Sequence, residues 1–184
     1  MPSLDSFNIE KFKAKFGDGA KGSLFYFQPQ WPGGVQTSLS PEDVVYLVKT
    51  ATIPNTVLEE ATVAWQGFDY KYATKHTYAD LAITFYVDLQ AKVRMLFENW
   101  SNLVHNPLTN EYSTTNEYMM DQKLQMVGYQ GQTIMEFTMH HAYPKEVGTI
   151  AMDYATNDYI TFDVTFSYLY HTISFNESGG AVNV

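Results

Sequence analysis

Residues 81–105, LAITFYVDLQAKVRMLFENWSNLVH, change their hydrophobic period at Asp88. Before Asp88 the apolar residues alternate, as in a half-buried strand: Leu81, Ile83, Phe85 and Val87. After it they recur at spacings of three and four and line one face of a helix: Leu89, Val93, Leu96, Phe97, Trp100, Leu103 and Val104. Asp88 stands where an N-cap is expected, because its carboxylate can accept from the free N–H groups of the first turn. The stretch predicts a strand followed by an amphipathic helix over about 89–105, with Phe97 and Trp100 in the core.

Most of the remaining chain has the residue pattern of β structure. Strands are expected at residues 23–28, 44–53, 61–72, 123–129, 133–141, 148–153 and 159–170. Gly67 marks a turn or bulge, Gln130–Gly131 a hairpin turn, and Pro144 the end of a strand. In the last strand the residues that face one way are Ile160, Phe162, Val164, Phe166, Tyr168 and Tyr170. The pattern predicts a mainly β protein, a β-sandwich or barrel-like subunit with one flanking helix.

The 184 residues are expected to form one domain, 1–184. Residues 1–22 have the composition of a polar, basic arm, and residues 174–184 that of a flexible polar tail. Residues 106–120 are expected to form a polar loop after the helix. Cysteine is absent, which excludes disulfides, thiolate metal sites and a cysteine nucleophile. No apolar run is long enough for a signal peptide or a membrane helix, so no contact with a membrane is expected.

The charge is unevenly distributed along the chain. The formal net charge is −9, yet four of the lysines lie in the arm: Lys11, Lys13, Lys15 and Lys21. The acidic remainder argues against binding to nucleic acid phosphates. Charged residues make up 17% of the chain and aromatic residues 16%, a balance that is typical of protein–protein interfaces.

The sequence motifs that could indicate cofactor binding or metal binding are weak. Residues 17–22 match GxGxxG, but a charged arm precedes them and a strand follows, which is the wrong order for a dinucleotide loop. His140 and His141 are adjacent on a strand and point to opposite faces, so a metal site would need His76 or His171 as well.

Carboxylates that could act in acid–base chemistry occur at Asp153, Asp158 and Asp163, although solvation at turns and strand edges explains them more simply. No nucleophile elbow, zincin motif or P-loop is present. We therefore predict no catalytic, cofactor-binding or metal-binding residues. The helix face with Phe97 and Trp100 could instead line a groove for a small ligand. This interpretation is more specific but less favoured than packing of that face on a sheet.

Taken in order, the segments resemble the tail tube proteins of contractile-tailed bacteriophages. The resemblance covers about Gly19 to His171, and its pieces are GAKGSLFYFQ, VVYLVKTATIPNT, VAWQGFDYKYA, ITFYVD before the helix that ends FENWSNLV, HHAYPKEV and MDYATNDYITFDVTFSYLYH. Their order is more specific than any single piece, above all the aromatic strand that ends at Asp88 before a helix with Phe97 and Trp100.

The resemblance implies a structural virion protein without catalytic activity. Six subunits would form a ring, their strands would join into a continuous inner β-barrel, and stacked rings would form a tube inside a contractile sheath. The tube would be assembled in the host cytoplasm and conduct DNA during ejection. Implied partners are further copies of the chain, the tail sheath protein, the baseplate and tail terminator proteins, and, in the lumen, the tape measure protein and double-stranded DNA.

Two sets of contact residues are expected on this basis. Contacts between rings are assigned to the arm and to residues 50–56 and 106–120, in particular Thr52, Ile53, Pro54, Asn55, Thr56, Tyr112 and Asn116. The polar face of the last strand is assigned to the lumen through Thr161, Asp163, Thr165 and Ser167. Alternatives are a baseplate-proximal tube initiator, the inner tube of a phage-tail-like injection or secretion device, a ligand-binding β-sandwich and a small hydrolase.

Overall fold

The computed structural model describes residues 9–17, 19–155, 157–177 and 180–183. The helices are α1 (Ile9–Phe16), α2 (Pro41–Val45), α3 (Lys92–Val104) and α4 (Thr115–Tyr118). The strands are β1 (Phe25–Gln28), β2 (Val48–Ala51), β3 (Thr56–Trp65), β4 (Phe68–Tyr78), β5 (Leu81–Tyr86), β6 (His105–Asn106), β7 (Glu111–Tyr112), β8 (Met120–Val127), β9 (Thr133–Val147), β10 (Thr161–Ser167), β11 (Tyr170–Glu177) and β12 (Gly180–Asn183). The protein is mainly β, as the sequence predicts.

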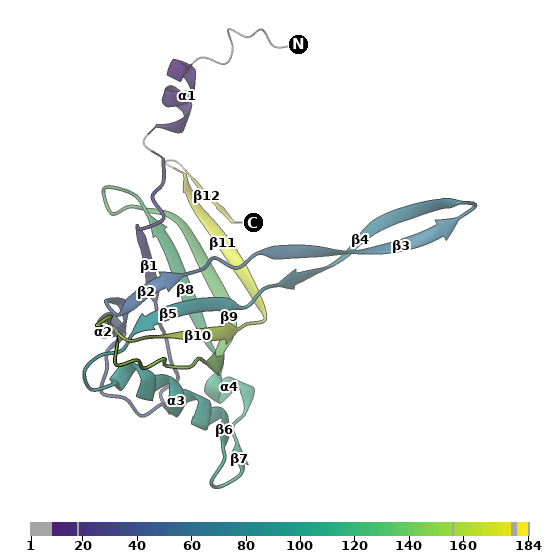
Figure 1. Ribbon diagram of the computed structural model, residues 1–184. Coiled ribbons are helices and arrows are strands. Elements are labelled where there is room, and N and C mark those ends of the chain that lie inside the picture. The colour runs from purple at the N-terminus through teal and green to yellow at the C-terminus, as the bar shows by residue number, and fades with distance from the viewer. Residues whose placement is uncertain (1–8, 18, 156, 178–179, 184) are drawn as a thin grey trace.

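The long strand β9 joins two halves of one antiparallel sheet, which has eight strands among the described residues. Its first part pairs with β8 and β11, and its last residues pair with β10, which continues to β5 and β2. His141 lies between the two parts with a φ of 55°, the left-handed region, so the strand bends there. The two halves cross at a steep angle (Figure 1).

The core lies between the two halves of the sheet and helix α3. Phe97 of α3 sits between strand aromatics, with its ring centroid 5.0 Å from Phe85 and 5.9 Å from Phe166. Trp100 meets Phe166 edge to face at 6.1 Å. The predicted alternation is confirmed within β10, where Phe162, Val164 and Phe166 are buried, but not at its ends, because Ile160 precedes the strand and is exposed and Tyr170 belongs to β11. Helix α3 therefore closes one end of the core, and its face with Phe97 and Trp100 is packed against the strands.

Helix α3 begins three residues later than predicted. A turn over residues 88–91 follows β5, with Ala91 at the N-cap position in the left-handed region (φ 51°). Asp88 still serves the first turn, because its Oδ1 accepts from the Val93 N–H at 3.2 Å. Leu89 falls in the turn and is fully exposed, so it does not belong to the apolar helix face.

The prediction of a single helix was wrong, because α1, α2 and α4 are also helical. Helix α2 replaces the start of the predicted strand 44–53, and its signal is present in the sequence. Ser40 and Asp43 form a capping box around Pro41, the first helical residue. Thr114 and Glu117 form the same motif at α4, inside the predicted loop 106–120.

Strand β9 does not stop at Pro144, as predicted, but continues to Val147. Pro144 opposes Phe166 where the β9–β10 register shifts, a position that tolerates a residue without an N–H. No strand forms over residues 148–153, which belong to a loop. Of the predicted tail 174–184, residues 174–177 continue β11 and residues 180–183 form β12, whereas residues 178, 179 and 184 lie outside the described residues.

One buried polar side chain holds the segment after β1. Gln122 on β8 is fully buried, and its Nε2 donates to the Gln30 carbonyl at 2.6 Å. The Gln30 N–H donates back to Oε1 of Gln122 at 3.1 Å. The side-chain amide of Gln122 therefore pairs with the backbone of Gln30 as a neighbouring strand would.

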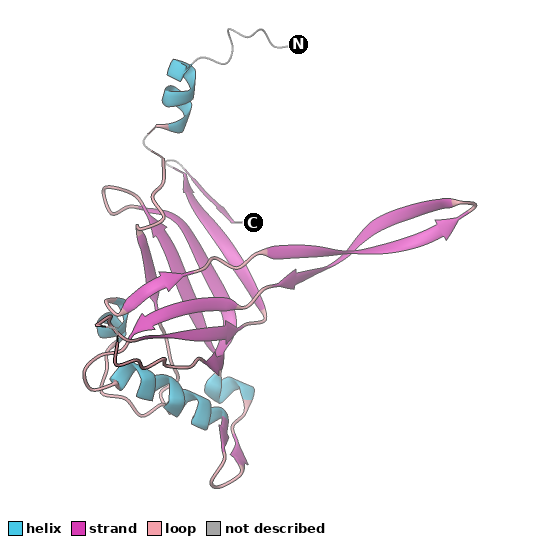
Figure 2. Cartoon of the chain, viewed as in Figure 1, coloured by secondary structure: helices cyan, strands magenta, loops and turns pink. Residues whose placement is uncertain are grey.

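Helices α2, α3 and α4 gather toward one end of the molecule, and α1 stands alone at the other (Figure 2). The hairpin of β3 and β4 extends sideways from the body, and the small β6–β7 hairpin projects from the end opposite α1 (Figure 1). These projections define the candidate contact surfaces.

Candidate assembly surfaces

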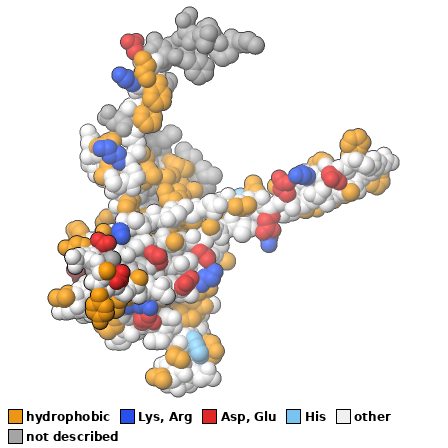
Figure 3. All heavy atoms as spheres, viewed as in Figure 1, with side chains coloured by type: hydrophobic (Ala, Val, Ile, Leu, Met, Phe, Trp, Pro, Cys, Tyr) orange, Lys and Arg blue, Asp and Glu red, His pale blue; other side chains and the backbone are white. Residues whose placement is uncertain are grey.

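The β3–β4 hairpin is an amphipathic two-stranded ribbon that stands away from the body. Directly opposed pairs put six residues on one face: Ala61, Val63, Trp65, Phe68, Tyr70 and Tyr72. The opposite face carries Thr62, Asp69 and the ion pair Lys71–Glu60, with 3.4 Å from Nζ to Oε2. Trp65 is 71% exposed and Phe68 80%, so nothing in the described chain covers these two rings. In Figure 3 the hairpin stands clear of the body, with hydrophobic side chains near its tip and charged side chains along the ribbon. A two-stranded hairpin is marginally stable by itself in water, so this exposed aromatic face is a candidate contact surface.

The root of the hairpin is held by a cluster on β11 and the preceding turn. Nε2 of His171 lies 3.2 Å from Oγ1 of Thr56, the first residue of β3. Nδ1 of the same ring lies 3.2 Å from the hydroxyl of Tyr168. Tyr78, the last residue of β4, packs edge-on against His171 at 4.9 Å between centroids. The hairpin is therefore rigidly seated at its base and exposed beyond it.

Burial sets the titration of this cluster. It lowers the pKa of His171 below its ordinary value and raises the pKa of Tyr168 to about 12, with the carboxylate of Asp80 adding to the latter. His171 is thus neutral at pH 7, and one imidazole can donate to one hydroxyl and accept from the other.

The residues expected to contact another ring at positions 52–56 lie at the hairpin root. Thr52 donates its N–H to the Ala82 carbonyl at 3.1 Å, and Ala79 donates to the Asn55 carbonyl at 3.2 Å. Ile53 is exposed, whereas Pro54 is buried within the subunit. All members of this set except Pro54 are open to contact.

The two other expected contact residues lie at the opposite end. Tyr112 of β7 stacks on His105 of β6 with ring centroids 4.2 Å apart, and it is largely exposed. Asn116 is exposed on α4, which is anchored to the core because Trp100 Nε1 donates to the Tyr118 carbonyl at 2.8 Å. The structure thus separates the predicted contact residues into two groups at different ends of the subunit.

The residues assigned to the lumen share the solvent-facing side of β10: Thr161, Asp163, Thr165 and Ser167. A polar ladder crosses this face. Thr50 of β2 donates to Thr84 of β5 at 2.9 Å, and the Thr84 hydroxyl donates to Oδ1 of Asp163 at 2.6 Å. The face is polar, hydrogen-bonded and uncovered among the described residues.

A second polar sheet face was not predicted. It carries Asp121 on β8, His140 on β9 and Thr172 on β11, linked by Asp121 Oδ2 to His140 Nδ1 at 2.9 Å and His140 Nε2 to Thr172 Oγ1 at 3.1 Å. Burial alone would raise the pKa of Asp121, but the His141 N–H and the His140 ring outweigh it and lower that pKa. The alternation of polar residues in 121–125 and 136–140 was the available signal for this face.

Three features of the structure bear on the predictions made about cofactor binding, metal binding and membrane contact. The glycine motif lies between α1 and β1, a helix-to-strand order that cannot form a dinucleotide loop, and Asp18 within it lies outside the described residues. Among the described residues, no group of three or more His, Cys, Asp or Glu side chains could hold a metal ion. In the same residues, no helix is long and apolar enough to cross a membrane.

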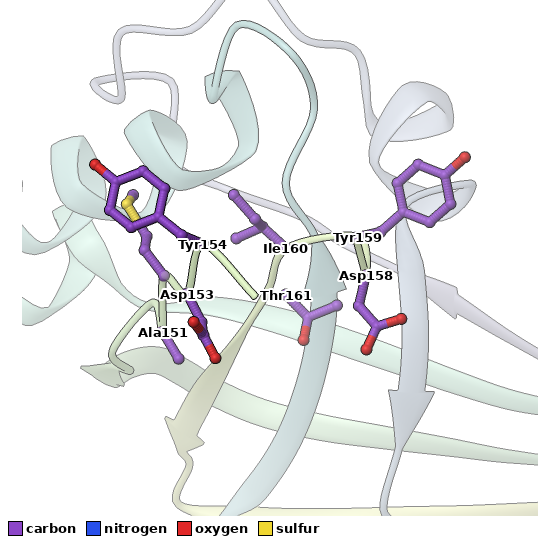
Figure 4. A pocket seen from close by; sticks show the side chains of 8 residues that line it. Ala151, Asp153, Tyr154, Asp158, Tyr159, Ile160 and Thr161 are labelled. Atoms are coloured by element: carbon purple, nitrogen blue, oxygen red, sulfur yellow. The ribbon is translucent and has the colours of Figure 1, made fainter. Parts of the chain in front are cut away.

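A shallow pocket of about 470 Å³ is formed by the loop before β10. Asp153 and Asp158 point to the same side of this loop, while Tyr154 and Tyr159 diverge (Figure 4). Asp153 Oδ1 accepts from the Ala155 N–H at 2.9 Å, an ordinary loop turn. Asp163, the third candidate carboxylate, belongs to the separate ladder on β10. The candidate acid–base residues are therefore not assembled into one site.

Comparisons with known proteins agree with this architecture. A chain of the PVC sheath–tube complex, an extracellular contractile injection system in its extended state, is similar with a TM-score of 0.63 at 9% identity, over 92% of this chain and 99% of that chain. A chain of the anti-feeding prophage tube-terminating cap gives 0.62 at 11% identity, over 85% and 91%. Hcp1 from Salmonella typhimurium gives 0.51 at 12% identity, over 86% and 90%. These likenesses show a shared fold.

No curated protein sequence is significantly similar to this chain. The family described as phage tail tube protein matches residues 26–174, which include both halves of the sheet, the projecting hairpin and α3. The resemblance drawn from the sequence is thereby confirmed. The chain belongs to the phage tail tube protein family.

Proposed function

We propose that this chain is the inner tail tube subunit of a contractile phage tail, assembling into stacked hexameric rings that conduct DNA during ejection. The exposed aromatic face of the β3–β4 hairpin is the observation that carries the proposal. In an isolated subunit the Trp65 and Phe68 side chains remain in water, where their apolar surface adds nothing to stability. A ring of copies covers that face on each subunit by the same contact.

The sheet edges support the same assembly. The described path of paired strands ends at β1 and β2, and β12 pairs with β11 alone. Open edges promote uncontrolled association unless they are short or occupied. Ring closure would give each edge a neighbour and would extend the strands of one copy into those of the next.

The polar face of β10 is proposed to line the lumen through Thr161, Asp163, Thr165 and Ser167. Asp163 repeated around a ring would present negative charge to DNA, and the formal charge of −9 adds to it. Screening limits this repulsion to about 8 Å at physiological salt. The wall would therefore keep the duplex from adhering without binding it, and the tape measure protein would occupy the same channel before ejection.

Contacts between rings are proposed at the two separated groups of residues. Thr52, Ile53, Asn55 and Thr56 would meet the end of the next subunit that carries Tyr112 and Asn116. Such a contact joins different surfaces of two copies and can be repeated without limit, as stacking requires. Tail terminator and baseplate proteins would then cover the two ends of the tube.

The outer surface of α3 is proposed to face the sheath inside the virion, after assembly in the host cytoplasm. The Arg94 side chain on this helix already interacts with other residues of the same subunit. It is paired with Glu98 at 2.6 Å, it donates to the Gly148 carbonyl, and its guanidinium lies 5.3 Å from the ring centroid of Phe162. Lys92 is the cation of this helix left for a sheath contact.

Electron microscopy of the purified chain tests the proposal. Rings with six-fold symmetry, or tubes made from them, are expected above a threshold protein concentration. A protein that stays monomeric at about 100 µM, well above the micromolar range of ordinary specific interfaces, would contradict it.

A second candidate stays within the same class. The similarity to two chains of PVC, an extracellular contractile injection system, and to one of the anti-feeding prophage cap, with TM-scores of 0.59 to 0.63, also favours the inner tube of a phage-tail-like injection device or a baseplate-proximal initiator. Density for DNA inside tubes isolated from lysates would separate the phage tail from the injection device.

A further inference from the structure

Helix α1 carries an exposed apolar ridge at one end of the molecule. Ile9 is 64% exposed, Phe12 57% and Phe16 59%, and their spacing puts them on one side of the helix. The two phenylalanine rings stack with centroids 5.1 Å apart, which makes a single aromatic plate. Isolated helices shorter than about 12–15 residues are marginal in water, so these eight residues need a packing partner.

An apolar pocket opens near the foot of the same helix. Its volume is about 330 Å³, and its walls come from the linker after α1, β1, β2 and the segment following it, β8 and β9: Lys21, Gly22, Leu24, Phe25, Ala51, Thr52, Ile53, Leu124, Gln125, Met126 and Phe137. A cavity of about 150 Å³ accommodates one benzene ring. The pocket thus has room for the aromatic plate of α1.

The helix cannot readily enter the pocket of its own chain. Lys21 and Gly22 of the linker form part of the pocket wall, and α1 leaves that wall pointing away from the body (Figure 1). Gly17 ends the helix in the left-handed region (φ 56°), and its N–H donates to the Lys13 carbonyl at 2.8 Å. The Phe16 ring lies against Gly19, where a Cβ would come within 2.6 Å of it. Reversal of α1 would break the contact between Phe16 and Gly19.

We propose that the Ile9–Phe12–Phe16 ridge of α1 docks in this pocket of a second copy of the chain. Helix α1 carries Glu10 against Lys11, Lys13 and Lys15, so it has a formal charge of +2 and the rest of the chain −11. Each arm is therefore attracted to the body of another copy. Because ridge and pocket lie at the same end of the subunit, the two copies stand side by side in one orientation, as neighbours in a ring.

This contact deepens the proposed function and rests on it. It moves the arm from the contact between rings, where the sequence suggested it, to a contact within a ring. Ile53 belongs to the pocket rim and would then touch the neighbouring α1, so Ile53 also moves from the contact between rings to the contact within a ring. Helix α1 precedes the family match over residues 26–174, so the exchange of arms would be an addition to the family fold and no part of its shared core.

Single-cysteine variants test the proposal directly, because the wild-type chain has no cysteine. Phe12→Cys protein is mixed with Ile53→Cys protein under assembly conditions and then oxidised. We expect a disulfide-linked heterodimer between the two variants, which only an intermolecular contact can produce. The matched control replaces Ile53→Cys with Leu108→Cys, on the exposed loop between β6 and β7 at the opposite end.

Three results overturn the inference. Rings that form without the Phe12–Ile53 link overturn it and leave the proposed function intact. A Phe12–Leu108 link in its place shows stacking contact between opposite ends. A wild-type chain that stays monomeric and gives no link overturns both the inference and the proposed function.

A second measurement uses the double variant Phe12→Ala/Phe16→Ala. We expect about a tenfold rise in the concentration needed for ring formation, as for the loss of an interface anchor, with unchanged monomer circular dichroism. The control Leu89→Ala removes a fully exposed apolar side chain near α3 and should leave the threshold unchanged. Equal thresholds for wild type and the double variant contradict the docking of α1.

Discussion

Oγ1 of Thr56 lies 3.2 Å from Nε2 of His171, although 115 residues separate them in the chain. The contact joins the first residue of the projecting hairpin to β11 of the body. Tyr78 closes the other side of the ring, so both strands of the hairpin meet at one imidazole. The His171 imidazole therefore contacts the root of the aromatic ribbon on both of its strands.

Stability should depend on pH through His171. Burial lowers its folded-state pKa, so the unfolded chain takes up a proton near pH 6.5 while the folded chain resists protonation. The free energy of unfolding should be at its full value above pH 6.5 and fall as the pH drops from 6.5 toward the lowered pKa. Tyr168, with a pKa of about 12, stays neutral throughout this range. Urea unfolding between pH 5.5 and 7.5 measures the trend, and His171→Gln should flatten it. An unchanged slope in that variant would contradict the role of His171.

Removal of the hairpin aromatics should abolish assembly without unfolding the subunit. The double variant Trp65→Ala/Phe68→Ala deletes two largely exposed rings, so the free energy of unfolding should change by less than about 0.5 kcal/mol. Ring formation, followed by light scattering, should be lost because the interface loses its largest anchors. Asp69→Asn alters the other face of the same ribbon and should still assemble. Loss of assembly in both variants would point to a general defect of the hairpin.

Trp100→Ala should destabilise the subunit by about 3–5 kcal/mol, the usual cost of removing a large buried aromatic side chain. Trp100 is 1% exposed, and its Nε1 donates to the carbonyl of Tyr118, so α4 also loses its anchor. Urea unfolding measures the loss. Trp65→Ala is the matched control, a tryptophan that is 71% exposed on the hairpin. A near-neutral Trp100→Ala would place α3 outside the core.

Gln122→Met keeps the shape of the buried side chain but removes its amide. The N–H and carbonyl of Gln30 would lose their partners, since both hydrogen bonds run to Gln122. We expect a loss of about 1–3 kcal/mol in the free energy of unfolding, the penalty for a polar group left unsatisfied on burial. Gln125→Met removes a half-buried glutamine that pairs with Glu136 on the other side of β8, and it should cost less. Equal effects would show that water satisfies Gln30 in the variant.

The sequence predicts a strand or helix correctly where one face of that element is buried. The alternation in β5 and β10 and the three–four spacing in α3 follow from the burial of one face, so Phe85, Phe97 and Phe166 were identifiable as core residues. The ordered aromatic and turn pattern also sufficed to assign the family. Even the capping boxes at Ser40 and Thr114, which define α2 and α4, were present as local signals.

The relations between distant segments were decided only by the tertiary structure. The bend of β9 at His141, the passage of that strand through Pro144 and the seating of the hairpin on His171 depend on partners far away in sequence. The same is true of the pocket beside α1, whose walls come from four separate segments of the chain. A residue's own neighbours determine its periodicity, whereas its exposure depends on which other strands fold against it. The exposed aromatic ribbon and the separation of contact residues to two ends could therefore not be derived from the chain alone.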